Sequence, residues 1–258
     1  MRDSDIALAN RLADAAGAVI RPLFRTSFAV DDKGDASPVT AADREAEAAM
    51  RRLIEAEAPR DGIVGEEHGE KSSQTGRQWI LDPIDGTTSF IAGRPIFGTL
   101  IALLEDGWPV LGLIDQPIAR ERWVGAAGRP TTFAGGPART RPCPTLVEAV
   151  LATTSPHLFD EDGAGRFLAL AGRVARRSVL YGGDCYNYAL LASGHLDIVV
   201  EAGLKLHDFA ALVPVVEGAG GRMSDWHGDP LHAESTGDVI ALGDPARFDD
   251  VIEALAGG

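Results

Sequence analysis

The segment at residues 79–90 restricts the fold of this chain more than any other part of its sequence. An apolar run that reads as a buried β-strand ends at Asp82, and Asp85 follows three residues later. Gly86 and two threonines then suit the start of a helix, whose first backbone N–H groups are free to bind an anion. Because Mg²⁺ prefers hard oxygen ligands, the segment predicts a metal site beside a phosphate site. Asp-Pro and Asp-Gly also form ordinary turns, so the segment alone leaves a simple turn open.

Further carboxylates stand at the predicted ends of helices and strands elsewhere in the chain. They are Asp43, Glu66, Glu67, Glu201 and Asp208. Asp43 follows Thr40 by three residues, and this pair suits the first turn of a helix, where a hydroxyl cap and a carboxylate favour the positive end of the dipole. Each acid alone could be a solvated cap or loop residue. The whole set suggests a site that gathers carboxylates around divalent cations.

The remaining pattern indicates helices first, then a run of strands, and then helices and strands in alternation along the chain. Helices are expected at residues 3–24, 41–58, 163–175, 185–193 and 208–218. Strands are expected at residues 62–65, 78–81, 97–104, 110–115, 121–125, 147–153 and 196–201. This order predicts an antiparallel-rich sheet and an α+β or layered α/β architecture. The Gly-, Pro- and Arg-rich stretch 135–145 should connect an N-terminal half, residues 1–140, to a C-terminal half, residues 141–258.

Charge and composition exclude several classes of protein. The net charge of −14 opposes binding to nucleic acid, because a polyanion requires clustered Lys and Arg. No apolar run approaches the roughly 20 residues that cross a bilayer, and the acidic start lacks the regions of a signal peptide, so we expect no membrane partner and a cytoplasmic location. Cys143 and Cys185 are expected to be buried, reduced thiols.

Four segments of the chain together resemble the motif set of the inositol-monophosphatase-like, lithium-sensitive phosphatases. They occur in the same order and at comparable spacings, at residues 39–43, 65–67, 79–90 and 201–211. The resemblance implies a five-layered αβαβα sandwich, of the type shared with fructose-1,6-bisphosphatase, and a homodimer. It also implies two or three Mg²⁺ ions, which Mn²⁺ could replace, and inhibition by lithium. The small-molecule partner would be a phosphate monoester.

The resemblance assigns the metal ligands residue by residue. Glu66, Asp82 and the Ile84 carbonyl would hold the first ion, and Asp82, Asp85 and Asp208 the second. Two ions can activate water and neutralise charge during in-line displacement at phosphorus, so no covalent phosphoenzyme is needed.

The remaining catalytic roles also come from the resemblance. The backbone amides of Gly86 and Thr87, with Thr88 beside them, would bind the phosphate. Asp43 and Thr87 would orient and deprotonate the attacking water, with Glu66 as a further catalytic residue. Glu67 has no assigned ligand role, although it could help to hold a third ion.

Substrate choice is expected to depend on the stretch at residues 182–188, which resembles the histidinol-phosphatase branch. Asp184 replaces the small uncharged residue usual in inositol-preferring relatives. With Glu201 it would supply two carboxylates that suit the ammonium and imidazole groups of histidinol phosphate, and Asn187 is expected to contact the same substrate. Asp184 could instead cap the helix that follows it.

Two alternatives to a histidinol-phosphate phosphatase remain open. One is an inositol-1-phosphate or broad sugar-phosphate phosphatase, and the other is a regulatory or scaffold protein that keeps this fold. His207 departs from the family pattern, in which many relatives have Trp, and a ligand role for it is disfavoured because Mg²⁺ avoids imidazole. Of Tyr186 and Tyr188, at most one should face the substrate. The tryptophans are expected in the core or at an interface.

Overall fold

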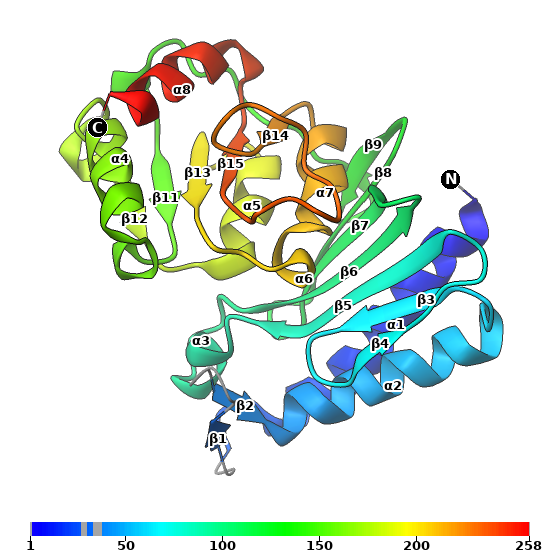
Figure 1. Cartoon of the computed structure of the whole chain (residues 1–258). Helices are drawn as coiled ribbons and strands as arrows, with labels where there is room; N and C mark the ends of the chain where they lie inside the picture. Colours follow the sequence, from blue (N-terminus) through cyan, green and yellow to red (C-terminus); the bar gives the residue numbers. More distant parts are fainter. Residues whose placement is uncertain (1, 27–29, 33–37, 258) are drawn as a thin grey trace.

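Two β-sheets and three layers of helices alternate across the molecule (Figure 1). The structure is a computed structural model that describes residues 2–26, 30–32 and 38–257. The helices are α1 Asp3–Leu23, α2 Ala41–Glu57, α3 Thr87–Ile91, α4 Glu161–Ala171, α5 Asp184–Ala192, α6 Leu206–Phe209, α7 Leu212–Gly218 and α8 Phe248–Ala256. Short 3₁₀ turns lie at Leu146–Glu148, Pro156–Leu158, Arg176–Ser178 and Pro245–Arg247.

The strands divide into a large sheet, a smaller sheet and a separate hairpin. The large sheet consists of β3 Gly62–Gly65, β4 Gly69–Lys71, β5 Arg77–Asp85, β6 Gly98–Glu105, β7 Trp108–Gln116, β8 Glu121–Ala126, β9 Arg129–Phe133 and β10 Gly136–Pro137. The smaller sheet consists of β11 Leu151–Thr153, β12 Val179–Tyr181, β13 Ile198–Glu201, β14 Arg222–Ser224 and β15 Val239–Leu242. The hairpin pairs β1 Val30–Asp32 with β2 Pro38–Thr40.

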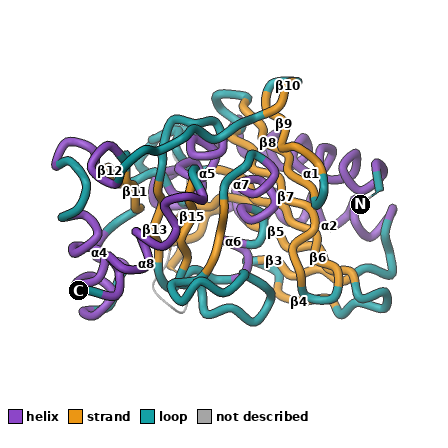
Figure 2. Tube along the Cα trace, turned by 90° about the horizontal axis from the view of Figure 1, so that it is seen from above, coloured by secondary structure: helices purple, strands orange, loops and turns teal. Residues whose placement is uncertain are grey.

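The large sheet is antiparallel except where β3 runs parallel to β5. Helices α1 and α2 cover one of its faces, and α5, α6 and α7 fill the space between the two sheets. Helices α4 and α8 cover the outer face of the smaller sheet, as the view from above also shows (Figure 2). This arrangement confirms the expected five-layered αβαβα sandwich.

Strand β6 shows why the central run of the sequence is apolar without interruption. Leu100, Ala102 and Leu104 face the layer between the sheets, whereas Ile101 and Leu103 face α1 and α2. Side chains alternate between the two faces of a strand, and here both faces are covered by helices. A strand buried on both sides therefore needs apolar residues at every position.

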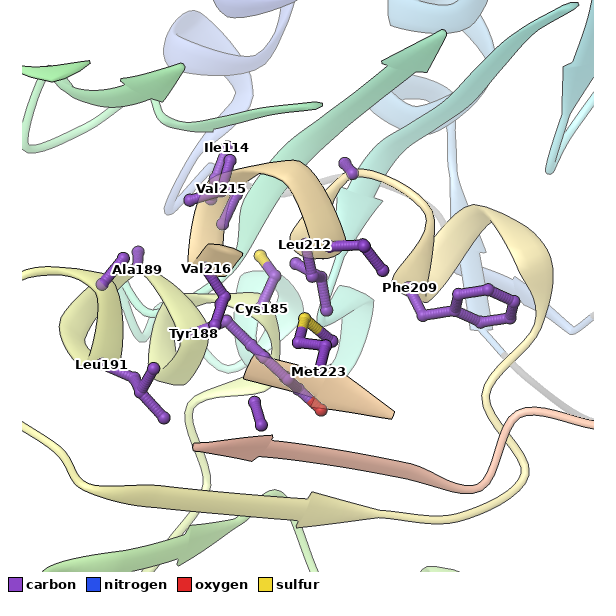
Figure 3. Packing of buried hydrophobic residues seen from close by; sticks show 14 of the residues in the cluster. Ile114, Cys185, Tyr188, Ala189, Leu191, Phe209, Leu212, Val215, Val216 and Met223 are labelled. Carbon is purple, nitrogen blue, oxygen red and sulfur yellow. The ribbon is translucent and has the colours of Figure 1, made fainter. Parts of the chain in front are cut away.

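The layer between the sheets is a hydrophobic core to which α5 and α7 both contribute. Cys185 and Tyr188 of α5 lie together with Leu212 and Val216 of α7 (Figure 3). Cys143 is buried in the outer core, beneath α4 and α8. Both cysteines are therefore free and buried, as expected.

The helix expected at residues 208–218 is wrong as one element, because the structure divides it into α6 and α7. Pro214 lies in the first turn of α7, where its missing N–H is tolerated, but it could not continue a helix from α6. The carbonyl of Ala211 also packs so closely on Gly112 that a Cβ there would lie 1.9 Å from its oxygen. The break leaves Asp208 within a short helix of its own.

Other element boundaries also differ from those expected. The strand expected at residues 147–153 is a 3₁₀ turn followed by β11, because the Glu148 backbone N–H bonds back to the Thr145 carbonyl. Helix α4 begins two residues early, since Asp160 caps it by accepting from the Gly163 N–H.

Trp108 is half exposed and lies against His232, outside the core, whereas the other tryptophans are buried. Within the described residues, no helix combines the length and apolar character of a transmembrane span.

Candidate active site

A β-bulge in β5 brings Asp82 and Asp85 to the same side of the sheet. Residues three apart on a regular strand point to opposite faces. Asp82 pairs with Leu100 of β6 and Asp85 pairs with Gly98, so three steps along β5 match two along β6. One extra residue in a strand restores the common direction, and Pro83 is tolerated there because the ladder is interrupted. Both aspartates thus lie within β5, which extends to Asp85, beyond the end of the strand that was expected near Asp82.

Four carboxylates from three regions of the chain converge at this end of β5. Asp82, Asp85 and Asp208 form one group whose ligand atoms all lie within 4.8 Å of one another. Glu66, just after β3, forms a second group with Asp82 and His207 within the same limit. Asp82 belongs to both groups and therefore lies at their centre. The structure brings together every side chain that the sequence predicted as a metal ligand.

Burial and mutual repulsion raise the pKa of the three aspartates in this cluster. The pKa of Asp82 is well above its ordinary value, chiefly through burial and then through the negative charges of Glu66, Asp85 and Asp208. Burial, followed by the charges of Asp184 and Asp208, does the same for Asp85. A buried oxygen of Asp82 has no hydrogen-bond partner among the described residues. These hard oxygen donors fit divalent cations, which would offset the repulsion.

The hydroxyl of Thr87 connects Asp43 to the end of β5. It lies 3.1 Å from the Ile84 carbonyl oxygen and 3.5 Å from the Asp43 carboxylate. Asp43 is fully buried in the first turn of α2, where Thr40 donates its backbone N–H and its hydroxyl to the carboxylate. Burial raises the pKa of Asp43, while the hydrogen bonds from Thr40 oppose that shift. The expected capping pair is thus confirmed, and it holds Asp43 against Thr87.

The turn after Asp85 presents backbone amides beside the carboxylates. Gly86 precedes α3 with a φ of 85°, a left-handed conformation that glycine adopts without a steric penalty. The N–H groups of the first residues of α3, including Thr87 and Thr88, have no carbonyl partner within a helix that starts there. The expected anion-binding amides therefore adjoin the acidic cluster.

Asp184 faces the turn at Gly86. A Cβ at Gly86 would lie 2.6 Å from the Asp184 carboxylate, and Ser89 of α3 donates a 2.9 Å hydrogen bond to it. Burial raises the pKa of Asp184, opposed by Ser89 and by the charge of Arg94. Asp184 is the first residue of α5, with a φ of 46°, and Gly183 occupies the cap position. Its carboxylate therefore bonds to α3 and does not cap α5, the alternative that the sequence left open.

A pocket of about 150 Å³ extends from the acidic cluster between the sheets. Its lining residues are Asp85, Thr154, Leu158, Asp184, Cys185, Tyr188, Glu201, Leu204, Asp208 and Leu212. Four of these residues are acidic, and no lysine or arginine is among the described residues that line it. Glu201 is buried and accepts hydrogen bonds from the Thr153 hydroxyl and the Thr154 N–H. The pocket is therefore strongly anionic beyond the metal-ligand candidates.

Glu201 should make metal-free protein less stable as the pH rises. Burial raises its pKa from 4.5 to about 7, against the opposing hydrogen bonds of Thr154 and Thr153. The folded state then binds more protons than the unfolded state between these values, so stability is lost across that range. At pH 8, Glu201→Gln should therefore raise the free energy of unfolding above that of the parent protein by roughly 3 kcal/mol at most. Thr153 can accept from the new amide group, which preserves the hydrogen bonding.

Urea unfolding with a chelator present, at pH 4.5 and at pH 8, would measure this effect. The variant should gain stability over the parent protein only at pH 8. An equal difference at both pH values would show that Glu201 is not buried with a raised pKa.

Asn187 is not among the residues that line the pocket. It is buried behind the turn before α5, donates to the Gly182 carbonyl, and fills the space that a Cβ at Gly183 would need. This placement supports the turn that presents Asp184. Tyr188 lines the pocket, whereas Tyr186 donates to Glu121 elsewhere, in keeping with the expectation that at most one faces the substrate.

Sequence reasoning overlooked Glu47. This residue lies in the middle of α2 and is fully buried, and it accepts hydrogen bonds from the backbone of the turn that carries Glu66. Its spacing of four residues from Asp43 and from Arg51 places all three on one face of α2. That spacing was the available signal, although it also suits an ordinary salt bridge on a helix.

Comparisons with known proteins agree with this fold and site. The model of the inositol monophosphatase family matches residues 1–255. The chain is 50% identical to "Bifunctional phosphatase IMPL2, chloroplastic" from Arabidopsis thaliana, covering 98% of this chain and 75% of that protein. It is 40% identical to a histidinol-phosphatase from Mycobacterium tuberculosis, covering 88% and 90%. A solved inositol monophosphatase from Zymomonas mobilis superposes with a TM-score of 0.90 at 55% identity, covering 98% of each chain.

The layered fold and its matches over the whole chain define a hydrolase of the phosphatase class. The chain belongs to the inositol monophosphatase family.

Proposed function

We propose that the protein is a metal-dependent phosphomonoesterase that hydrolyses L-histidinol phosphate to L-histidinol and phosphate. One observation carries this proposal: Asp184, which is partly buried, and Glu201, which is fully buried, add two carboxylates to a pocket that opens from the metal-ligand cluster. Burying the Glu201 carboxylate without a positively charged partner is unfavourable. A substrate that carries positive charge would supply that partner, whereas a neutral polyol would not.

The metal site in this proposal uses the residues that converge at β5. Glu66, Asp82 and the Ile84 carbonyl would hold one Mg²⁺, and Asp82, Asp85 and Asp208 a second, with Mn²⁺ as a substitute and Glu67 near a weaker third site. When bound, the ions supply positive charge against the phosphate and lower the pKa of water. His207 lies within reach of Glu66 and Asp82, but its imidazole is a poor ligand for Mg²⁺.

The side chains around Thr87 would move the proton in hydrolysis. The Thr87 hydroxyl lies 3.1 Å from the Ile84 carbonyl and 3.5 Å from Asp43; in this proposal its proton turns to Asp43 during the reaction, which leaves its oxygen free to accept from an attacking water. Asp43 is the base that takes the proton through this contact, and its raised pKa favours that role. The amides of Gly86, Thr87 and Thr88 would bind the phosphate oxygens while the ester bond breaks.

Names of relatives support the substrate class without deciding it. Three of the similar proteins are named histidinol-phosphatases, at 36–40% identity. The 55% identical solved structure carries the name inositol monophosphatase, which favours inositol 1-phosphate or a related sugar phosphate as the second candidate. The complete carboxylate cluster favours either enzyme over a scaffold protein.

Steady-state kinetics with Mg²⁺ on a panel of phosphate esters would test the proposal. We expect kcat/KM for histidinol phosphate to exceed that for inositol 1-phosphate and glycerol 2-phosphate by roughly 10²-fold, the effect of one to two charge-assisted contacts. Similar values for all three esters would favour the broad-specificity alternative. The absence of turnover on any ester would contradict both enzymatic readings.

A further inference from the structure

We propose that Glu47 and Arg51 of α2 are positioning residues that hold the turn bearing Glu66 and thereby set its affinity for the metal. This inference rests on the proposed role of Glu66 as a ligand. Neither Glu47 nor Arg51 belongs to the ligand groups themselves, so both would act through the backbone of residues 65–69.

The carboxylate of Glu47 is the anchor of this turn. It accepts the backbone N–H of Glu67 at 2.7 Å and that of His68 at 3.1 Å. Arg51 donates to the same carboxylate at 2.7 Å, and the whole Glu47 side chain is inaccessible to solvent. Hydrogen bonds to a buried charged group are stronger than neutral ones, so these contacts restrict the turn strongly.

Two further contacts fix the turn from its other sides. Arg51 also donates to the carbonyl of Gly69, where β4 begins. The backbone N–H of Glu66 donates to the carbonyl of Leu81 at 3.2 Å, immediately before Asp82 in β5. Glu66 is therefore held between α2 and the strand that carries the shared ligand.

Gly65 shows how closely Glu47 approaches this backbone. A Cβ at Gly65 would lie 2.0 Å from one carboxylate oxygen of Glu47, and the φ of Gly65 is not in the positive range. The glycine is required by proximity and not by its backbone conformation. The turn and the carboxylate thus fit against each other without room for a side chain.

Helix α2 consequently places two functional groups at once. Asp43 lies one turn before Glu47 on the same face, and Arg51 lies one turn after it. The helix that presents Asp43 to Thr87 also fixes the turn that presents Glu66 to Asp82. Residues behind metal ligands commonly alter metal affinity by 10- to 100-fold when changed, because they orient those ligands.

The test compares Glu47→Gln and Arg51→Gln in the full chain with a matched control, Asp197→Asn. Asp197 is also buried, pairs with Arg141 and accepts a backbone N–H, but it lies at the opposite end of β13 from Glu201. Titration calorimetry with Mg²⁺ alone should show affinity weakened roughly tenfold or more in Glu47→Gln. Arg51→Gln should show a smaller loss, and Asp197→Asn none.

Two further readouts separate positioning from general damage to the fold. At saturating Mg²⁺, turnover by Glu47→Gln should recover and KM for the phosphate ester should match that of the parent protein. Hydrogen exchange should be faster at residues 66–69 in both α2 variants and unchanged elsewhere. Arg51 is partly exposed on α2, so its variant tests the idea even if Glu47→Gln fails to fold.

Unchanged Mg²⁺ affinity in folded Glu47→Gln or Arg51→Gln would overturn the inference. So would rapid exchange of the Glu67 and His68 amides in the metal-free parent protein, which would show that the turn is not held. If the parent protein bound no Mg²⁺ at all, the proposed metal site itself would fail, which is a separate result.

Discussion

Replacing Asp82 by asparagine is expected to lower Mg²⁺-dependent turnover by at least about 10³-fold on every phosphate ester, equivalent to about 4 kcal/mol of transition-state stabilisation. Asp82 belongs to both candidate ligand groups, so its loss should impair both sites at once. The effect should appear in kcat at saturating substrate, because the pocket lined by Asp184 and Glu201 remains intact. Initial rates over a range of Mg²⁺ concentrations would measure it.

The same substitution should stabilise the protein when metal is absent. Asp82 is buried, and the charges of Glu66, Asp85 and Asp208 repel its ionised form. Asparagine removes that charge, so the melting temperature with chelator should rise, while the stabilisation by added Mg²⁺ should disappear. Asp197→Asn, which is remote from the cluster, should retain stabilisation by Mg²⁺. An Asp82→Asn protein that keeps normal turnover would refute the assigned metal site.

Replacing Asp184 by asparagine should reduce kcat/KM for histidinol phosphate by roughly 10- to 100-fold, the value of one charge-assisted hydrogen bond. Turnover of inositol 1-phosphate should fall much less, because a neutral polyol does not pair with the carboxylate. Asparagine tolerates the φ of 46° at this position and can still accept from Ser89, so the substitution isolates the charge. Parallel kinetics on the two esters would give the ratio.

Ser89→Ala provides a matched comparison for Asp184. It removes the hydroxyl that donates to the carboxylate but leaves the negative charge in the pocket. We expect a smaller loss of kcat/KM for histidinol phosphate than in Asp184→Asn, with the substrate preference unchanged. The carboxylate would still be present, but Ser89 would no longer orient it. Equal losses on both esters in Asp184→Asn would show that the pocket does not select for positive charge.

The metal cluster could be predicted from the sequence because its residues occur at recognisable positions relative to strands and helices. Thr40 and Asp43 form the expected cap, and Asp82, Asp85 and Asp208 meet as expected. The bulge in β5 could not be predicted, because it depends on the register with β6. Yet that bulge is what directs Asp82 and Asp85 to the same side.

Other features depend on close approach between segments distant in the sequence. The break between α6 and α7 has a local cause in Pro214, but it also reflects the close packing of Ala211 on Gly112, which no local pattern reveals. In the sequence, Glu47 resembles any polar residue of an amphipathic helix. Its hydrogen bonds from the Glu67 and His68 backbone depend on how α2 packs against a turn some 20 residues further along the chain. Asn187 was expected to contact the substrate, but its side chain donates a hydrogen bond to the Gly182 carbonyl instead. The order of the expected elements indicated a layered α/β or α+β architecture, whereas the five-layered αβαβα arrangement followed only from the resemblance.

Anomalous diffraction from crystals grown with Mn²⁺ would test the central claim most directly. We expect one anomalous peak among the oxygens of Asp82, Asp85 and Asp208, and a second beside Glu66 and Asp82. Crystals at saturating Mn²⁺ with no peak in this cluster, or with the ions bound only elsewhere on the protein, would contradict the account.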